Sequence, residues 1–128
     1  MNGDDERLRE HPKERFSERV RHLSIDHEYD ELVDEPRGEL DNHRQISLVN
    51  RHGLSLILFH FEEGGTLPPH DADGEVSIHV LDGQLDIRTS DGTKRVATGE
   101  VLILAPGVEH DAEAVRETKM LLTIGVDE

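Results

Sequence analysis

The feature that most constrains this chain is a series of short, apolar-rich segments separated by glycine turns, which runs from residue 45 almost to the C-terminus. The segments 54–61 (LSLILFHF), 75–81 (EVSIHVL) and 84–90 (QLDIRTS) have strand length, and an Asp-Gly pair directly follows each of the last two. Apolar and polar residues alternate in these last two segments, which is typical of strands with one buried face. Asp-Gly between such segments is a strong hairpin signal. The sequence therefore predicts an all-β domain, an antiparallel sandwich or barrel.

The length of 128 residues suits a single domain. We expect the β domain to span residues 45–126 and to follow an N-terminal extension over residues 1–44. The extension consists of a charged tail, a short helix over about 12–23 and an acidic linker. The helix is predicted because three apolar residues have the spacing of one helical face, namely Phe16, Val20 and Leu23.

Charge and composition exclude several classes of function. The net charge of −15 is spread along the chain and would repel nucleic acid and anionic membranes. The chain has no cysteine, so disulfide and thiolate chemistry are excluded. No apolar run approaches the ~20 residues that span a bilayer, and the charged N-terminus lacks the apolar core of a signal peptide. We therefore expect a cytoplasmic protein that has no nucleic-acid or membrane partner. The few lysines, three against 11 arginines, suit either a salt-rich cytoplasm or an ordinary acidic protein.

Two histidine-containing motifs lie within the β domain. In the first, Gly64 precedes His70 by six positions and the motif closes at Gly83; in the second, GEVLILAPGVEH ends at His110. These motifs resemble those of the cupin superfamily, and the resemblance covers about residues 45–126. It implies a double-stranded β-helix, the jelly-roll or RmlC-like barrel.

The resemblance also implies a metal site that this chain only partly retains. The family's usual ligands are two histidines and a glutamate from the first motif and one histidine from the second. Here the four positions hold His70, Ala72, Val76 and His110, so two of four ligands are absent. The chain therefore resembles a subgroup of small, stand-alone cupins with a degenerate metal motif and no assigned activity.

Two other residues are candidates for a third ligand. Glu75 is adjacent to the glutamate position, but neighbouring strand residues face opposite sides, so Val76 and Ile78 should point into the barrel and Glu75 away from it. His60 lies on a strand whose two faces are both apolar, so alternation does not decide which way its ring points. Zinc sites normally need at least three protein ligands, and the iron facial triad needs two histidines and a carboxylate.

These observations leave two main functions open. In the first, the barrel mouth binds a small molecule with little or no metal, through His70, His110, His60, Val76 and Ile78. In the second, the protein is a dioxygenase- or isomerase-type enzyme whose Zn, Fe, Ni or Mn ion is held by His70, His110 and a non-standard ligand such as His60 or Glu75. Two further alternatives are a metal-free enzyme with His110 as general base and a purely structural role. The resemblance also implies a homodimer, with segment 24–44 and the strand at 45–49 crossing to the partner.

Overall fold

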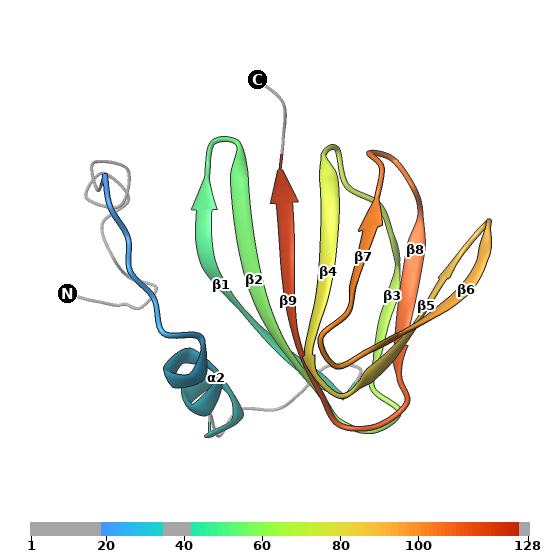
Figure 1. The fold of residues 1–128 in the computed structure, drawn as a ribbon, viewed down its shortest axis with the longest axis horizontal. Coiled ribbons are helices and arrows are strands. Elements are labelled where there is room, and N and C mark those ends of the chain that lie inside the picture. The colour runs from blue at the N-terminus through green and yellow to red at the C-terminus, as the bar shows by residue number, and fades with distance from the viewer. Residues whose placement is uncertain (1–18, 35–41, 126–128) are drawn as a thin grey trace.

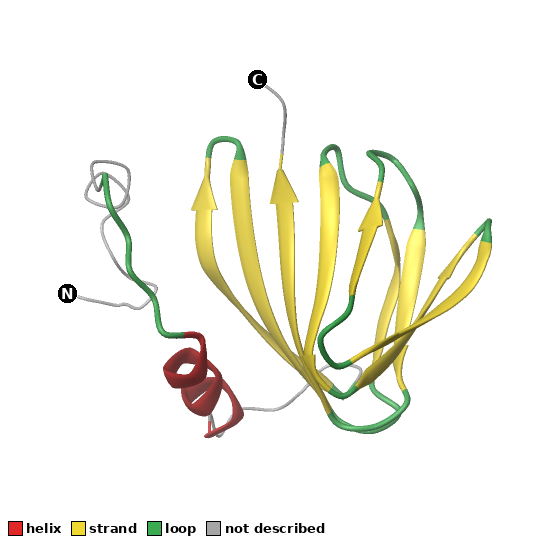
Figure 2. Cartoon of the chain, viewed as in Figure 1, coloured by secondary structure: helices red, strands yellow, loops and turns green. Residues whose placement is uncertain are grey.

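The structure is a computed structural model that describes residues 19–34 and 42–125. These residues form one helix and two antiparallel sheets that pack face to face (Figures 1 and 2). The five-stranded sheet has the order β1-β2-β9-β4-β7, and the four-stranded sheet has the order β3-β8-β5-β6. The elements are α2 (Ile25–Asp34), β1 (His43–Arg51), β2 (Leu54–Phe61), β3 (Thr66–His70), β4 (Glu75–Asp82), β5 (Gln84–Thr89), β6 (Gly92–Ala97), β7 (Val101–Leu104), β8 (His110–Ala114) and β9 (Thr118–Gly125). The predicted all-β jelly roll is thus confirmed.

Most strands occur where alternation and turn residues predicted them. β2 has the predicted bounds, and the Asp-Gly pairs at 82–83 and 91–92 lie where β5 is joined to β4 and to β6. Gly83 has a φ of +123°, and a Cβ there would collide with Thr118, so glycine alone fits this turn. Within the described residues, no helix is long and apolar enough to cross a bilayer.

The N-terminal extension differs from the prediction. Of the helix expected over about 12–23, residues 12–18 lie outside the described residues, and residues 19–24 form neither helix nor strand. The structure shows a helix, α2, that was not predicted, within the segment interpreted as an acidic linker. Ser24 caps it, because the Ser24 hydroxyl accepts a hydrogen bond from the His27 amide (3.2 Å). Ile25, Tyr29 and Leu32 follow at helical spacing, and Leu32 is buried.

The barrel interior is mainly aliphatic, with two stacked phenylalanines and the buried ring of His43 beside them. Phe59 and Phe61 of β2, with ring centroids 5.6 Å apart, pack in one cluster with Val76, Ile78 and Val80 of β4. The same cluster includes residues of the four-stranded sheet, such as Leu85 and Ile87. Because both sheets contribute to it, this cluster holds the two layers together.

Helix α2 lies outside the barrel, at one end of the five-stranded sheet (Figure 1). Its residues pack against a second apolar cluster built on Leu48, Val49 and Leu58. The Arg44 guanidinium donates to the carbonyl of Val33 (2.6 Å) in the last turn of the helix, where carbonyls have no helical partner. One end of the outer face of this sheet is therefore apolar and covered by the chain's own helix.

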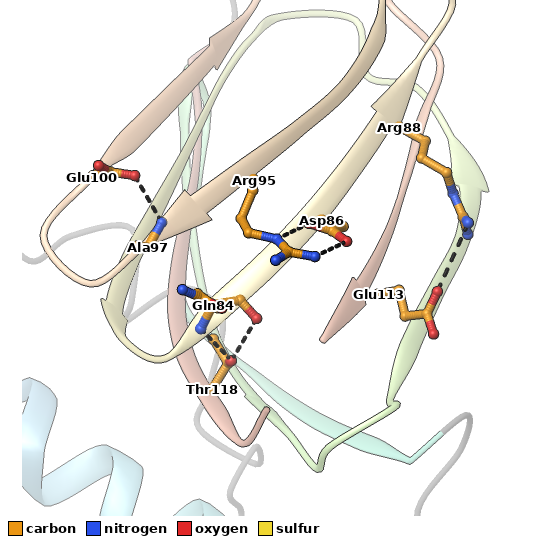
Figure 3. Close-up of polar contacts among 8 residues, drawn as sticks. All are labelled: Gln84, Asp86, Arg88, Arg95, Ala97, Glu100, Glu113 and Thr118. Carbon is orange, nitrogen blue, oxygen red and sulfur yellow. Dashed lines mark hydrogen bonds and ion pairs between the residues drawn. The ribbon is translucent and has the colours of Figure 1, made fainter. Parts of the chain in front are cut away.

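The outer face of the four-stranded sheet is charged instead. The Arg95 guanidinium donates to both carboxylate oxygens of Asp86 (2.8 and 3.0 Å), and it holds the pKa of that carboxyl below its usual value. Arg88 pairs with Asp111 (2.8 Å) and with Glu113 (3.8 Å), which faces it from the neighbouring strand in Figure 3. The outer face of the four-stranded sheet therefore has the charged surface expected of a solvent-exposed face.

Candidate functional site

Pairing of β3 with β8 brings together the two histidines that the sequence singled out. His70, the last residue of β3, is the direct register partner of His110, the first residue of β8. The register shifts between Leu67 and His70, where two prolines that have no amide hydrogen interrupt the ladder. β3 is an edge strand, which is where prolines are tolerated in a sheet.

A hydrogen bond between loops fixes the position of this pair. The amide of Gly107 donates to the carbonyl of Ala72 (2.9 Å), which joins the loop after β3 to the loop before β8. Gly107 has a left-handed φ of +82°. The first and second motifs, far apart in the sequence, are thus connected directly beside the two histidines.

The geometry of the two rings determines which nitrogen carries the proton. The ring centroids of His70 and His110 are 4.2 Å apart, with a tilt of 59°. His70 Nδ1 lies 2.8 Å from the carbonyl of Pro68, and His110 Nδ1 lies 3.0 Å from the carbonyl of Val108. A carbonyl only accepts hydrogen bonds, so each Nδ1 must donate. In the neutral rings, both Nε2 atoms therefore carry lone pairs.

The environment favours the neutral form of His110. This residue is only 3% exposed. Burial lowers its pKa; the hydrogen bond to the Val108 carbonyl opposes the shift, the neighbouring His70 adds to it, and the net direction is downward. At neutral pH the site therefore presents the lone pair of His110 rather than a cation.

The positions where the resemblance implies further ligands are apolar. Val76 is 3% exposed in the barrel core, and Ala72 packs against the same cluster. In the part of the chain that the structure describes, no three His, Cys, Asp or Glu side chains are placed to hold a metal ion together. The residues present therefore do not fit the four-ligand site of the family, although two correctly oriented histidines remain.

Neither candidate for a third ligand joins the pair. His60 lies on the outer face of the five-stranded sheet, because its neighbours Phe59 and Phe61 fill the interior. Its Nε2 donates to Glu117 (2.9 Å), and its ring meets Tyr29 of α2 edge-on at 5.7 Å. In this structure His60 therefore packs between Tyr29 and Glu117 and does not join the histidine pair, and a role for it as a third ligand stays a prediction.

The side chains of β4 alternate between the core and the exposed side, as the sequence predicts. Val76 and Ile78 point into the core, being 3% and 2% exposed. Glu75 precedes them on the exposed side, so it does not point into the barrel. Ligand contacts at Val76 and Ile78 stay a prediction.

Sequence reasoning did not find the two backbone carbonyls that orient the histidines. Pro68 and Val108 each lie two residues before the histidine that they anchor. The shared sequence signal is a turn or proline pair shortly before each histidine. A separate hollow of about 320 Å³, on the four-stranded sheet and partly lined by Asp86, Arg95 and Glu113, contains none of the predicted site residues.

Comparisons with known proteins agree with this fold. Residues 57–125 match the family model described as the cupin domain. A conserved protein of unknown function from Streptococcus pyogenes is 26% identical, with a TM-score of 0.68 over 87% of this chain and 91% of that one. An RmlC-like cupin from Desulfovibrio desulfuricans is also 26% identical (TM-score 0.63; 73% and 92% covered). A cupin 2 conserved barrel domain protein from Leptotrichia buccalis is 28% identical (TM-score 0.65; 75% and 45% covered). No curated protein matches the chain.

Proposed function

This chain belongs to the cupin domain family, and from that premise we propose that its His70–His110 pair binds a small molecule without a resident metal. The observation that supports this proposal is the fixed tautomer of both rings. Each Nδ1 is engaged by a carbonyl, so in the neutral form of each ring Nε2 offers a lone pair. Two adjacent acceptors select a ligand that carries hydrogen-bond donors.

The chemical class of the ligand follows from the surroundings of the pair. The adjacent Ala72 is half-buried and apolar, as is Leu67 on β3. A ligand with hydroxyl, amino or protonated carboxyl donors on a partly apolar body satisfies both kinds of surface. A carboxylate or phosphate is a poorer match, since neutral Nε2 atoms have no hydrogen to donate to it.

A second candidate is a metal-dependent activity, and one observation favours it. Histidines that bind metals usually donate their other ring nitrogen to a carbonyl or carboxylate, as both histidines do here. With only two protein ligands, such a site would hold zinc, iron, nickel or manganese weakly, and water or substrate would complete the coordination.

The test compares untagged wild type with His70→Ala and His110→Ala, and uses His27→Ala on the exposed face of α2 as the matched control. Elemental analysis after incubation with zinc, iron, nickel or manganese measures bound metal. Ligand-observed NMR with a panel of small hydroxy and amino compounds measures metal-free binding. We expect no stoichiometric metal, and at least one compound that binds wild type and His27→Ala but neither site variant.

Two results would decide against this proposal. One metal per chain that both site variants lose would favour the metal-dependent candidate. Compounds that bind all four proteins equally would place the binding site away from the histidine pair.

A further inference from the structure

The number of hydrogens that the histidine pair can accept narrows the class of ligand. The ring centroids of His70 and His110 are 4.2 Å apart, and each Nδ1 donates to a carbonyl of its own strand region. In the neutral rings each Nε2 therefore only accepts, and the two acceptors lie side by side. A hydroxyl group carries one hydrogen and satisfies one of them. A primary ammonium group carries three hydrogens and can donate to both.

His110 provides the acceptor that most requires a partner. Its side chain is only 3% exposed, and its Nδ1 is bonded to the Val108 carbonyl. Among the residues that the structure describes, no group donates a hydrogen bond to its Nε2. Polar atoms of buried side chains are nearly always hydrogen-bonded, so an acceptor left over on a buried ring indicates a place where a ligand donates.

The charge beside the pair favours a cation as that ligand. Asp71 directly follows His70 and is exposed. Burial has the largest effect on the pKa of His110 and lowers it, but the negative charges of Asp111 and Asp71 both act against this shift, so both reach the ring. Arg88 pairs with Asp111 at 2.8 Å and compensates its charge. Within residues 19–34 and 42–125, no cation pairs with Asp71.

We propose that the ligand of the His70–His110 pair is a protonated primary amine, which Asp71 selects over a neutral alcohol of the same shape. This assignment rests on the function proposed above, because it concerns the same pair. The ammonium N–H groups donate to Nε2 of the two rings, the Asp71 carboxylate attracts the positive charge, and an apolar body lies against Leu67 and Ala72.

The protonation states required are compatible with each other. An alkyl ammonium group keeps its proton at about pH 8, because its pKa is close to the ~10.4 of lysine, whereas an ordinary histidine with a pKa of about 6.5 is neutral. Asp71 contributes through its charge and not as a third metal ligand, since the described part of the chain places no three such side chains around one point. An organic cation does not require that convergence.

The experiment is a set of ligand-observed NMR titrations of the untagged full-length chain, at about pH 8 and about 0.1 M KCl. The probes are butyl, benzyl and cyclohexylmethyl compounds, each as the amine, the alcohol and the corresponding carboxylate. Asp71→Asn removes the charge and keeps the shape, and Asp71→Glu keeps the charge. The matched control, Asp30→Asn, removes the same charge from the exposed side of α2, and His110→Ala removes one acceptor.

At least one amine should bind wild type about ten-fold more tightly than its alcohol, and the carboxylates should bind more weakly than either. Asp71→Asn should weaken amine binding by about three- to ten-fold and change alcohol binding by less than about two-fold. Asp71→Glu and Asp30→Asn should bind the amine like wild type. His110→Ala should weaken amine and alcohol alike.

The results separate failure of this inference from failure of the function on which it rests. If an alcohol that His110→Ala loses binds wild type as tightly as its amine, or if Asp71→Asn and Asp30→Asn weaken amine binding equally, selection by Asp71 is overturned while the histidine pair remains a binding site. If no compound distinguishes wild type from His110→Ala, the pair is not the binding site, and both proposals are overturned.

Discussion

Restoring the two missing ligand positions should turn this barrel into a zinc-binding protein. The perturbation is Ala72→His together with Val76→Glu. Val76 is 3% exposed, so the glutamate gives up about 2 kcal/mol of apolar burial and brings a carboxyl into the core. The metal-free variant should therefore be less stable than wild type by roughly 3 kcal/mol or more. In this sum, burying the carboxyl costs about as much as leaving one buried polar group without a hydrogen-bond partner.

Zinc should reverse this loss. A metal that binds only the folded state contributes about 2.7 kcal/mol at a hundred-fold excess over Kd. At 4–8 °C per kcal/mol for a domain of this size, the melting temperature should rise by about 10–20 °C. Scanning calorimetry of untagged protein in zinc and in chelator measures the rise, with Ala72→His plus Val76→Gln as the near-isosteric control.

The control should show a clearly smaller rise, and adding His110→Ala to the test variant should remove most of it. Equal melting temperatures in zinc and in chelator for the test variant would refute the reasoning. Positions 72 and 76 would then not converge on the histidine pair, and the ligand positions implied by the cupin motif would not apply to this chain.

Three further outcomes test other parts of the structure. Because burial lowers the pKa of His110, the unfolded chain binds more protons than the folded one at and just below the ordinary pKa of about 6.5. The contribution of neutral His110 to the stability of the fold is present above that pH and is lost as the pH falls through the lowered pKa. The melting temperatures at pH 5 and pH 7.5 should therefore differ less in His110→Asn than in wild type. Gly83→Ala should destabilise the fold by about 2 kcal/mol or more in urea titrations, since alanine tolerates neither its φ nor the approach of Thr118. Leu32→Ala should cost about 2–5 kcal/mol of helix docking, which hydrogen exchange would show as lost protection in α2 while the barrel strands keep theirs.

The strands could be predicted because they depend on local signals. Alternation and glycine turns operate over a few residues, and most of the barrel obeys them. β3 is the exception: its Pro68 and Pro69 argue against a strand, and only its place at a sheet edge makes pairing with β8 tolerable. The edge position of β3 depends on the whole fold and cannot be predicted from the five residues of the strand.

Helix α2 was not predicted for a similar reason. Phe16, Val20 and Leu23 have helical spacing, but so do Ile25, Tyr29 and Leu32, which lie among acidic residues that suggested a linker. The second set forms α2, where Leu32 and Tyr29 have an apolar sheet face to pack against. Most helical stability in proteins comes from such packing, so spacing alone could not show that this acidic segment is helical. The preceding Ser24 was the local signal that favoured the second.

The direction of the His60 side chain could not be predicted either, because it also depends on the packing of α2 on the sheet. Both faces of β2 are apolar because one fills the barrel and the other lies under α2, so the strand lacks the alternation that would show which face is internal. Without knowledge of the helix, no pattern in LSLILFHF distinguishes a ligand from a packed residue. The unpredicted helix α2 is therefore also the reason why the direction of the His60 side chain could not be predicted.

The loss of two ligands changes what the histidine pair requires from its surroundings. A complete four-ligand site would bury a carboxylate and several imidazoles, which is costly unless a metal compensates for it. Ala72 and Val76 remove that cost and extend the apolar core. The tautomers of His70 and His110 persist because they depend only on carbonyls two residues earlier in the chain. A ligand of the kind proposed above would therefore supply the hydrogens, or the cation, that Nε2 of each neutral ring can accept.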